Sequence, residues 1–345
     1  MSIKIGIIVN NQYHPRDDPV MRLEEQYLMI RHARDKGWHS ALASMHYLQD
    51  PGSTALQQVP LLARLQAEAG EMTMGVAIYL LNLHNPVYTA ETMATLDIIS
   101  RGRLIFGIGL GYRDAEFNAF GVPKGQRVQR MVDYLALIKR LWSEDNVTAE
   151  GPWGRVDNAT LQLRPIQKPH PPLWIAANHD NAVKRAAHIG DCWYINPHAT
   201  LETNRRQMKL FVDERKAAGL PLPKEIPCRK EIFCARDRRT ALEMAGPYLE
   251  ERYRIYSSWG QEKAMPKGES FDKPFEELAN DRFVIGSPED CYEQLRPYWE
   301  ELGVNHFVFR TYFIGMPISN ALHSMHMISD ELLPALRSVR ANPLV

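Results

Sequence analysis

The sequence lacks three features that would place a protein in a membrane, outside the cell or on a polyanion. It has no run of about 18 apolar residues, so we expect no membrane span. Its 41 lysines and arginines balance 41 aspartates and glutamates, which gives no reason to expect nucleic acid or an anionic membrane as a partner. The first residues, MSIKIGIIVNN, lack the apolar core and cleavage site of a signal peptide. We therefore expect a cytoplasmic protein.

Cysteine is also scarce, and its spacing excludes further classes. The four cysteines form neither a CxxC pair nor a zinc-site spacing, which is typical of a reduced enzyme. His323 and His326 could share one helix face, but no third metal ligand is evident. The sequence therefore predicts no disulfide framework and no metal site.

Strand-like and helix-like runs alternate almost to the end of the chain, which predicts a single α/β domain over residues 1–345. Eight such units without a composition break favour a (β/α)8 TIM barrel, and a doubly wound sheet is the alternative. A β-hairpin is expected over Val147–Leu163. The expected strands are Lys4–Val9, His39–His46, Met72–Leu80, Leu104–Leu110, Leu173–Ala177, Cys192–Asn196, Cys228–Ala235 and His306–Thr311. The expected helices are Arg22–Lys36, Gln57–Ala69, Pro86–Ser100, Arg127–Ser143, Asn181–Ile189, Leu201–Ala218, Ser287–Leu302 and Ser319–Leu336.

One segment departs from this alternation. Tyr256–Asp281, after the seventh expected strand, is rich in Gly, Pro, Ser and charged residues. A structureless stretch of this length inside a compact domain is usually a lid or a disordered segment. We predict an insertion that covers the site, with a surface embellishment as the alternative.

Glycines punctuate the fourth expected strand. Gly107, Gly109 and Gly111 alternate, so they would share one face of that strand, where glycine allows another group to approach the backbone. The spacing is not a dinucleotide fingerprint, because no helix follows as G-x-G-x-x-G requires, and the chain has no P-loop motif. A ligand or a neighbouring strand could fill the space.

The stretch from Leu80 to Val122 carries a distinctive series of short motifs. They are Asn85-Pro86, Leu96-Asp97, Gly102-Arg103-Leu104, Gly107 to Gly111, Glu116-Phe117 and Phe120-Gly121. In order and spacing this block resembles the bacterial luciferase-like, flavin-dependent monooxygenases, as do Ser44–Leu48 and Leu173–Trp193. The resemblance extends from Ile5 to Leu336 and implies a TIM barrel with its site at the C-terminal ends of the strands.

The resemblance implies a flavin phosphate site at the turn after the fifth strand, formed by Asn178, His179, Asp180, Asn181 and Ala182. A helix N-terminus offers free N–H groups and a positive dipole end, although an ordinary helix cap is the alternative. The turn departs from the commoner Gly-Gly-x-Ser form, and Asp180 would have to point outward as the N-cap. Many relatives carry an arginine where this chain has Leu110, so either Arg113 or another group replaces it or this contact does not exist. Further expected cofactor contacts are Asn82, Gly109, Gly111 and Tyr112.

His46 is the expected catalytic residue. It matches the first histidine of a segment that is often Glu-His-His in the family and here is Met45-His46-Tyr47. Histidine exchanges protons near neutral pH, whereas a lone histidine is otherwise more often structural. Tyr47, Tyr194, His198 and Arg310 are expected to line a substrate pocket. For the aromatic residues a plain core role is the alternative, and Arg310 could instead pair with Glu231.

The resemblance implies an FMN-dependent, two-component monooxygenase. Reduced FMN from a separate NAD(P)H:flavin reductase would react with O₂ to a flavin C4a-(hydro)peroxide and oxygenate a small organic substrate. The aromatic strand ends favour an apolar or aromatic substrate over a highly charged one. The alternatives are F420-dependent hydride transfer on the same barrel and a flavin-binding protein without catalysis. We also expect a homo-oligomer, either a dimer or a tetramer.

Overall fold

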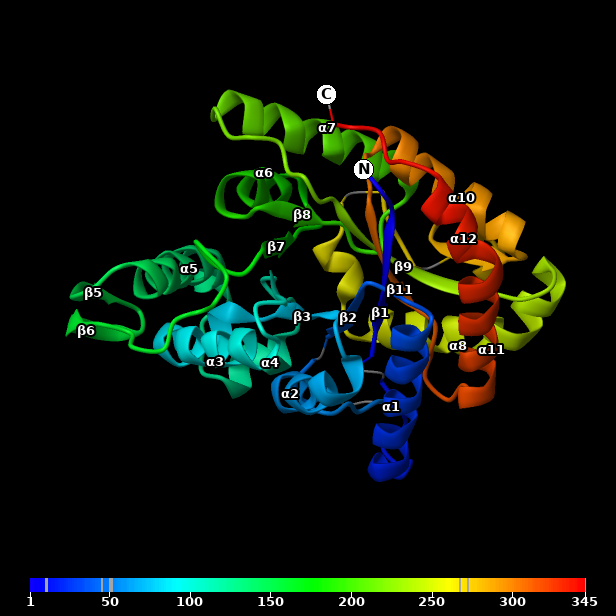
Figure 1. Cartoon of the computed structure of the whole chain (residues 1–345), viewed down its shortest axis with the longest axis horizontal. Helices are drawn as coiled ribbons and strands as arrows, with labels where there is room; N and C mark the ends of the chain where they lie inside the picture. The colour runs from blue at the N-terminus through cyan, green and yellow to red at the C-terminus, as the bar shows by residue number, and fades with distance from the viewer. Residues whose placement is uncertain (10–11, 45, 50–51, 267, 272, 345) are drawn as a thin grey trace.

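The core of the molecule is a curled sheet of parallel strands (Figure 1). The computed structural model describes residues 1–9, 12–44, 46–49, 52–266, 268–271 and 273–344. In this part the sheet has nine strands, in the order β10-β9-β11-β1-β2-β3-β4-β7-β8. The strands are β1 (Lys4–Ile8), β2 (Ser40–Ala43), β3 (Thr73–Tyr79), β4 (Leu104–Ile108), β7 (Leu173–Ala176), β8 (Cys192–Tyr194), β9 (Pro227–Cys234), β10 (Phe283–Gly286) and β11 (His306–Arg310).

Backbone hydrogen bonds after β8 bring the two sides of the sheet together. Ile195 donates its N–H to Pro227 O at 3.0 Å, and Arg229 donates to Ile195 O at 2.8 Å. Strands β1, β2, β3, β4, β7, β8, β9 and β11 thus follow one another around a ring, with β10 beside the second half of β9. The parallel α/β sheet expected from the sequence is confirmed, and its ring order differs from that of a doubly wound sheet. Strand β10 was missed.

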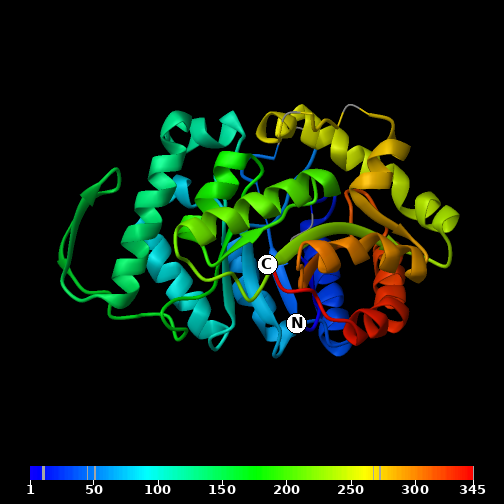
Figure 2. The same cartoon turned by 90° about the horizontal axis from the view of Figure 1, so that it is seen from above.

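Helices surround the strands, as Figures 1 and 2 show. Local sequence sets where several of them begin. Asn85 caps the helix that starts at Pro86 by accepting from Val87 N at 2.9 Å, and Ser287 and Asp290 form a reciprocal capping box. The longer helices are α1 (Pro19–Asp35), α2 (Gln58–Ala69), α3 (Pro86–Ile99), α5 (Arg127–Ser143), α6 (Asp180–Ile189), α7 (Leu201–Ala217), α8 (Arg238–Ser258), α10 (Pro288–Glu301) and α11 (Ile318–Met327). The shorter ones are α4 (Asp114–Ala119), α9 (Phe275–Asp281) and α12 (Leu333–Ser338).

The expected hairpin is present as β5 (Val147–Gly151) and β6 (Gly154–Ala159), which project from the body of the molecule in Figure 1. None of the helices in the described ranges is both long and apolar enough to cross a membrane.

The segment 256–281 is not the structureless insertion that its composition suggested. It begins as the last turn of α8, continues into a 3₁₀ turn at Gln261–Ala264, and ends in α9. Glu269 fastens it to α7, because its carboxylate accepts from Thr200 N at 2.9 Å and from Thr203 Oγ1 at 2.6 Å. Glu269 also pairs with Arg282 Nη2 at 2.6 Å. Weak helix periodicity concealed α8 and α9 in the sequence.

Gly107, in β4, and Gly109, just after its end, fit closely against strand β3. A Cβ on Gly107 would lie 2.4 Å from Val76 O, and one on Gly109 would lie 2.0 Å from Ile78 Cδ1. The expectation that all three glycines share a strand face is wrong. Strand β4 ends at Ile108, and Gly111 adopts a φ of 71°, which favours glycine. The neighbouring strand therefore accounts for Gly107 and Gly109.

Candidate active site

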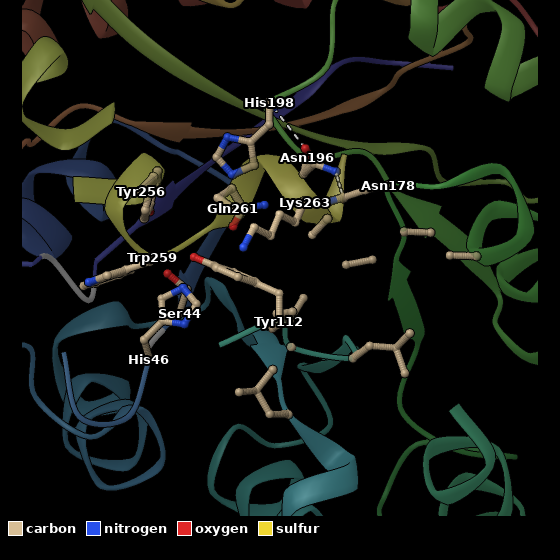
Figure 3. Close-up of a pocket in the computed structure, with 18 of the residues that line it drawn as sticks. Ser44, His46, Tyr112, Asn178, Asn196, His198, Tyr256, Trp259, Gln261 and Lys263 are labelled. Carbon is tan, nitrogen blue, oxygen red and sulfur yellow. Dashed lines mark hydrogen bonds between the residues drawn. The ribbon is translucent and has the colours of Figure 1, made fainter. Parts of the chain in front are cut away.

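A cavity of about 330 Å³ lies at the C-terminal ends of the barrel strands. This volume is within the range of small-molecule sites. Residues that follow β2, β4, β7 and β8 line it, and the segment after α8 contributes Trp259, Gln261 and Lys263. Figure 3 shows His46, Tyr112 and Trp259 gathered at one side, with His198 and Asn196 at another. This cavity lies where the site was expected, at the C-terminal ends of the strands.

His46 is held at the cavity wall by a buried carboxylate. Its Nδ1 lies 3.2 Å from Glu116 Oε1, and the same oxygen accepts from Tyr47 N at 2.8 Å. Glu116, in α4, is fully buried, whereas the His46 side chain keeps 20% of its surface exposed. The rings of Tyr112 and Trp259 lie 5.4 and 5.3 Å from the imidazole. Because the carboxylate engages Nδ1, Nε2 is left as the nitrogen that can exchange a proton with a bound molecule.

Arg113 does not take the place of the arginine that Leu110 replaces. Its guanidinium donates to Tyr47 O at 2.6 Å and to Leu48 O at 2.9 Å, and it stacks 4.2 Å from the Trp259 ring. These contacts hold the loop that carries His46. Lys124, in the 3₁₀ turn before α5, and Arg127, the first residue of α5, line the cavity instead.

The turn after β7 faces the cavity with three of its five expected residues: Asn178, His179 and Ala182. Asp180 and Asn181 do not line it. Asp180 turns toward α7, where Arg206 donates to it at 2.5 and 2.8 Å; this bond lowers the pKa of Asp180 to about 2. Asp180 therefore points away as expected, but the expectation that it is the N-cap is wrong. His179 is the N-cap, and it makes no side-chain cap bond.

Four other expected site residues lie behind the wall: Asn82, Gly109, Tyr47 and Arg310. Asn82 is fully buried and donates to Leu110 O at 3.1 Å, so it supports the loop after β4. Tyr47 Oη lies 2.8 Å from His84 Nε2, which directs it away from the cavity. Gly109 packs on Ile78, and Arg310 donates to Ser44 Oγ at 3.2 Å. None of the four lines the cavity, so each could affect a bound molecule only indirectly, by supporting other residues.

Tyr194 and His198 line the cavity as expected, together with Gly111 and Tyr112. His198 is 7% exposed, and burial lowers its pKa to about 3, so its imidazole is neutral at pH 7. Its Nδ1 has no hydrogen-bond partner among the described residues.

Several residues of the site were not found from the sequence. Glu116 was noted only as part of the Glu116-Phe117 motif, with no role assigned to it. No role was predicted for Arg229, Arg252, Tyr256 or Trp259. Arg229 and Glu231 alternate in β9 and therefore share a face, a signal that was present in the sequence. The two residues of α8 had no such signal, since that helix was missed. Within the described ranges, no three His, Cys, Asp or Glu side chains are grouped to hold a metal ion.

Comparison with known proteins identifies a family and several relatives. The family model described as luciferase-like monooxygenase matches residues 3–306. An F420-dependent glucose-6-phosphate dehydrogenase from Intrasporangium calvum is 26% identical over 326 residues, which cover 89% of this chain and 93% of the relative.

Two solved structures share the fold. Monooxygenase RslO1 from Streptomyces bottropensis has a TM-score of 0.86 at 23% identity, over 96% of this chain and 99% of the other. The oxygenating constituent of 3,6-diketocamphane monooxygenase from Pseudomonas putida, in complex with FMN, has a TM-score of 0.79 at 17% identity, over 97% and 99%.

Proposed function

Because this chain belongs to the luciferase-like monooxygenase family, we propose that it is an FMN-dependent monooxygenase. It receives reduced FMN from a separate NAD(P)H:flavin reductase and uses O₂ to oxygenate a small organic substrate. The observation that carries this proposal is His46, held by buried Glu116 at an aromatic wall of the cavity. A fixed histidine beside a water-poor surface suits proton transfer to a bound cofactor or substrate.

The donors around the cavity fit a flavin mononucleotide. The N-terminus of α6 presents N–H groups without a side-chain cap, and Arg127 brings positive charge to the same cavity, whereas Lys124 is paired there with Asp114 at 2.7 Å. These groups would hold the phosphate. Tyr112 and Trp259 would contact the ring system, which supplies the oxygen chemistry when it is bound in its reduced form.

In this reaction the protein orients, excludes water and moves a proton. Glu116 fixes the imidazole of His46 so that Nε2 faces the cavity. Tyr256, in the last turn of α8, and Trp259, just after it, cover the site. His198 is neutral at pH 7 and adds no charge to the wall.

We propose that the segment 256–281 acts as a lid on this cavity. Trp259, Gln261 and Lys263 line the cavity and must move if a large cofactor enters through this side. Limited proteolysis should cut this segment in the free protein and more slowly with FMN and substrate bound. Equal cleavage rates in both states would leave the segment a fixed wall.

F420-dependent hydride transfer is the second candidate, because the Intrasporangium calvum relative is described as F420-dependent. Equilibrium titration with FMN and with F420 separates the two. Tighter binding of FMN, with O₂ consumption and an oxygenated product when reduced FMN is supplied, supports the monooxygenase. Tighter binding of F420, with reduction of F420 by a substrate, overturns it. Binding of FMN without turnover across a substrate panel would indicate a non-catalytic flavin-binding protein.

A further inference from the structure

Strands β9 and β11 and helix α8 bring three arginines together beside the cavity. Arg229 lies at the cavity wall, whereas Arg252 and Arg310 are each 1% exposed. We call Arg229, Arg252 and Arg310 the arginine cluster. Within the described residues, Glu231 is the one carboxylate that makes an ion pair with this cluster, and it is fully buried. The cluster therefore carries more positive than negative charge.

Arg252 binds Oε1 of Glu231, whereas Glu231 Oε2 has no hydrogen-bond partner among the described residues. The Nε of Arg252 donates to Glu231 Oε1 at 2.9 Å, and its Nη1 donates to Gln12 Oε1 at 2.7 Å. Its Nη2 donates to Tyr256 Oη. Burial alone would raise the pKa of Glu231, but Arg252 and Arg229 hold it at about 2, so the carboxylate is ionised. Each guanidinium nitrogen of Arg252 thus has a hydrogen-bond acceptor, which indicates a structural role.

The other two arginines lack such partners. Arg229 Nη2 lies 3.7 Å from Glu231 Oε1, which is too long for a hydrogen bond. Among the described residues, Nε and Nη2 of Arg229 and Nε and Nη1 of Arg310 have no acceptor. The buried hydroxyl of Tyr194, on the cavity wall, also has none. Buried donors without acceptors are costly, and a group of them demands a missing acceptor.

We propose that Arg229, with Tyr194 beside it and Arg310 behind it, binds a carboxylate on the substrate. An arginine can receive a carboxylate through two parallel hydrogen bonds, which gives both affinity and orientation. The inference rests on the proposed function, since it assigns the substrate class of the same cavity. The carboxylate would supply the acceptor that the cluster lacks and would balance its charge.

The other residues of the cavity wall indicate the character of the substrate outside its carboxylate. Ile78, Leu80, Leu110 and Ala176 give the cavity an apolar surface. The substrate class is therefore an apolar or aromatic molecule with one carboxylate. The proposal adds one carboxylate to the apolar or aromatic substrate expected from the strand-end residues, among which Arg229, inside β9, was not counted.

Calorimetric titration with benzoate and with its neutral analogue benzamide tests the proposal. Both probes are titrated into cofactor-free and FMN-loaded protein. We expect benzoate to bind at least about tenfold more tightly than benzamide, as charge-assisted pairing requires. Arg229→Gln should remove this preference, Arg229→Lys should retain part of it, and Tyr194→Phe should weaken benzoate alone. Arg236→Gln, which removes an exposed charge, is the matched control.

Three results would overturn the assignment. They are equal affinities for benzoate and benzamide, an unchanged benzoate affinity in Arg229→Gln, and a loss of FMN affinity in Arg229→Gln while benzoate binding persists. The last result would give the cluster to the cofactor phosphate. Because the probes are also measured without cofactor, failure of FMN to bind would count against the proposed function and not against the carboxylate site.

Discussion

The two sides of the cavity treat buried charge differently. On the side of β2 and β4, the buried carboxylate of Glu116 is matched to one histidine and one backbone N–H. On the side of β9 and β11, the buried carboxylate of Glu231 makes ion pairs with Arg252 and Arg229 through Oε1, and Arg310 lies nearby without a carboxylate partner among the described residues. Both carboxylates are fully buried in the same barrel, yet their different neighbours indicate different roles.

The difference separates proton handling from charge recognition. A carboxylate with a single histidine fixes the orientation of the imidazole and the nitrogen that faces the cavity. A carboxylate shared by a cluster of arginines compensates part of a charge and leaves the remainder for a ligand. If this comparison holds, substitutions on the first side should change turnover and those on the second should change stability or substrate affinity.

The largest effect is expected from His46→Ala. The variant should fold and bind FMN but lose product formation by about 10²–10⁴-fold, the usual contribution of a general acid or base. Single-turnover measurement of product with reduced FMN gives the rate. Glu116→Gln should retain part of this activity and move the pH profile of turnover, since Glu116 acts only through His46. Unchanged turnover in His46→Ala would remove the histidine from the mechanism.

His46 could be predicted from the sequence because it combines a chemically suitable side chain with a strand end and a recognisable motif. The strand–helix alternation gave the parallel sheet for a similar reason, since buried strands are short apolar runs between turn residues. Arg310 and Asn82 show the limit. Both lie near strand ends, but whether such a side chain lines a cavity or supports the wall depends on packing that the sequence does not specify.

The region 238–286 was not predicted from the sequence for a different reason. Helix α8 contains Gly246 and Pro247, and β10 is only four residues long, so neither gives a clear periodic signal. Their positions are fixed by tertiary contacts such as the Glu269–Arg282 pair. Trp259 and Tyr256 could be placed at the cavity only once that packing was known.

A large difference in stability is expected between two arginines of the same cluster. Arg252→Gln breaks a buried pair and leaves Glu231 partly uncompensated, so it should lower the free energy of unfolding by about 3–5 kcal/mol. Arg229→Gln removes a cation without a hydrogen-bonded acceptor and should leave that free energy unchanged or raise it. Urea unfolding of the two variants measures both. Equal losses would mean that Arg229 is as structural as Arg252.

A moderate effect is expected from acid at His84, which lies on the histidine side of the cavity. Burial lowers the pKa of His84 to about 4, below the value of about 6.5 in an unfolded chain. The unfolded state therefore takes up the proton first. The free energy of unfolding is therefore unaffected by His84 above pH 6.5 and decreases as the pH falls toward 4. At pH 5 the loss amounts to about 2 kcal/mol.

Comparison with His84→Gln isolates this term. His39 and His198, whose pKa values are also lowered by burial, contribute to both proteins and cancel. The free energy of unfolding should fall less between pH 7.5 and pH 5 in the variant than in the wild type. The same fall in both proteins would show that His84 does not titrate as a buried neutral group.

The smallest effect is expected to separate two glycines that border β3. A Cβ on Gly107 would meet the backbone oxygen of Val76 at 2.4 Å, whereas one on Gly109 would meet the flexible end of Ile78 at 2.0 Å. Backbone yields less readily than a side-chain methyl, so Gly107→Ala should be less stable than Gly109→Ala by about 1 kcal/mol.

Ile78 lines the cavity, so Gly109→Ala should also change ligand affinity, which Gly107→Ala should leave nearly intact. Gly125→Ala is the matched control, because nothing lies within 4 Å of its added Cβ. Thermal unfolding and FMN titration of the three variants measure both consequences. If Gly109→Ala were the less stable of the pair with unchanged FMN affinity, Ile78 would be held as rigidly as backbone. The cavity wall beside β3 would then be fixed before any ligand binds.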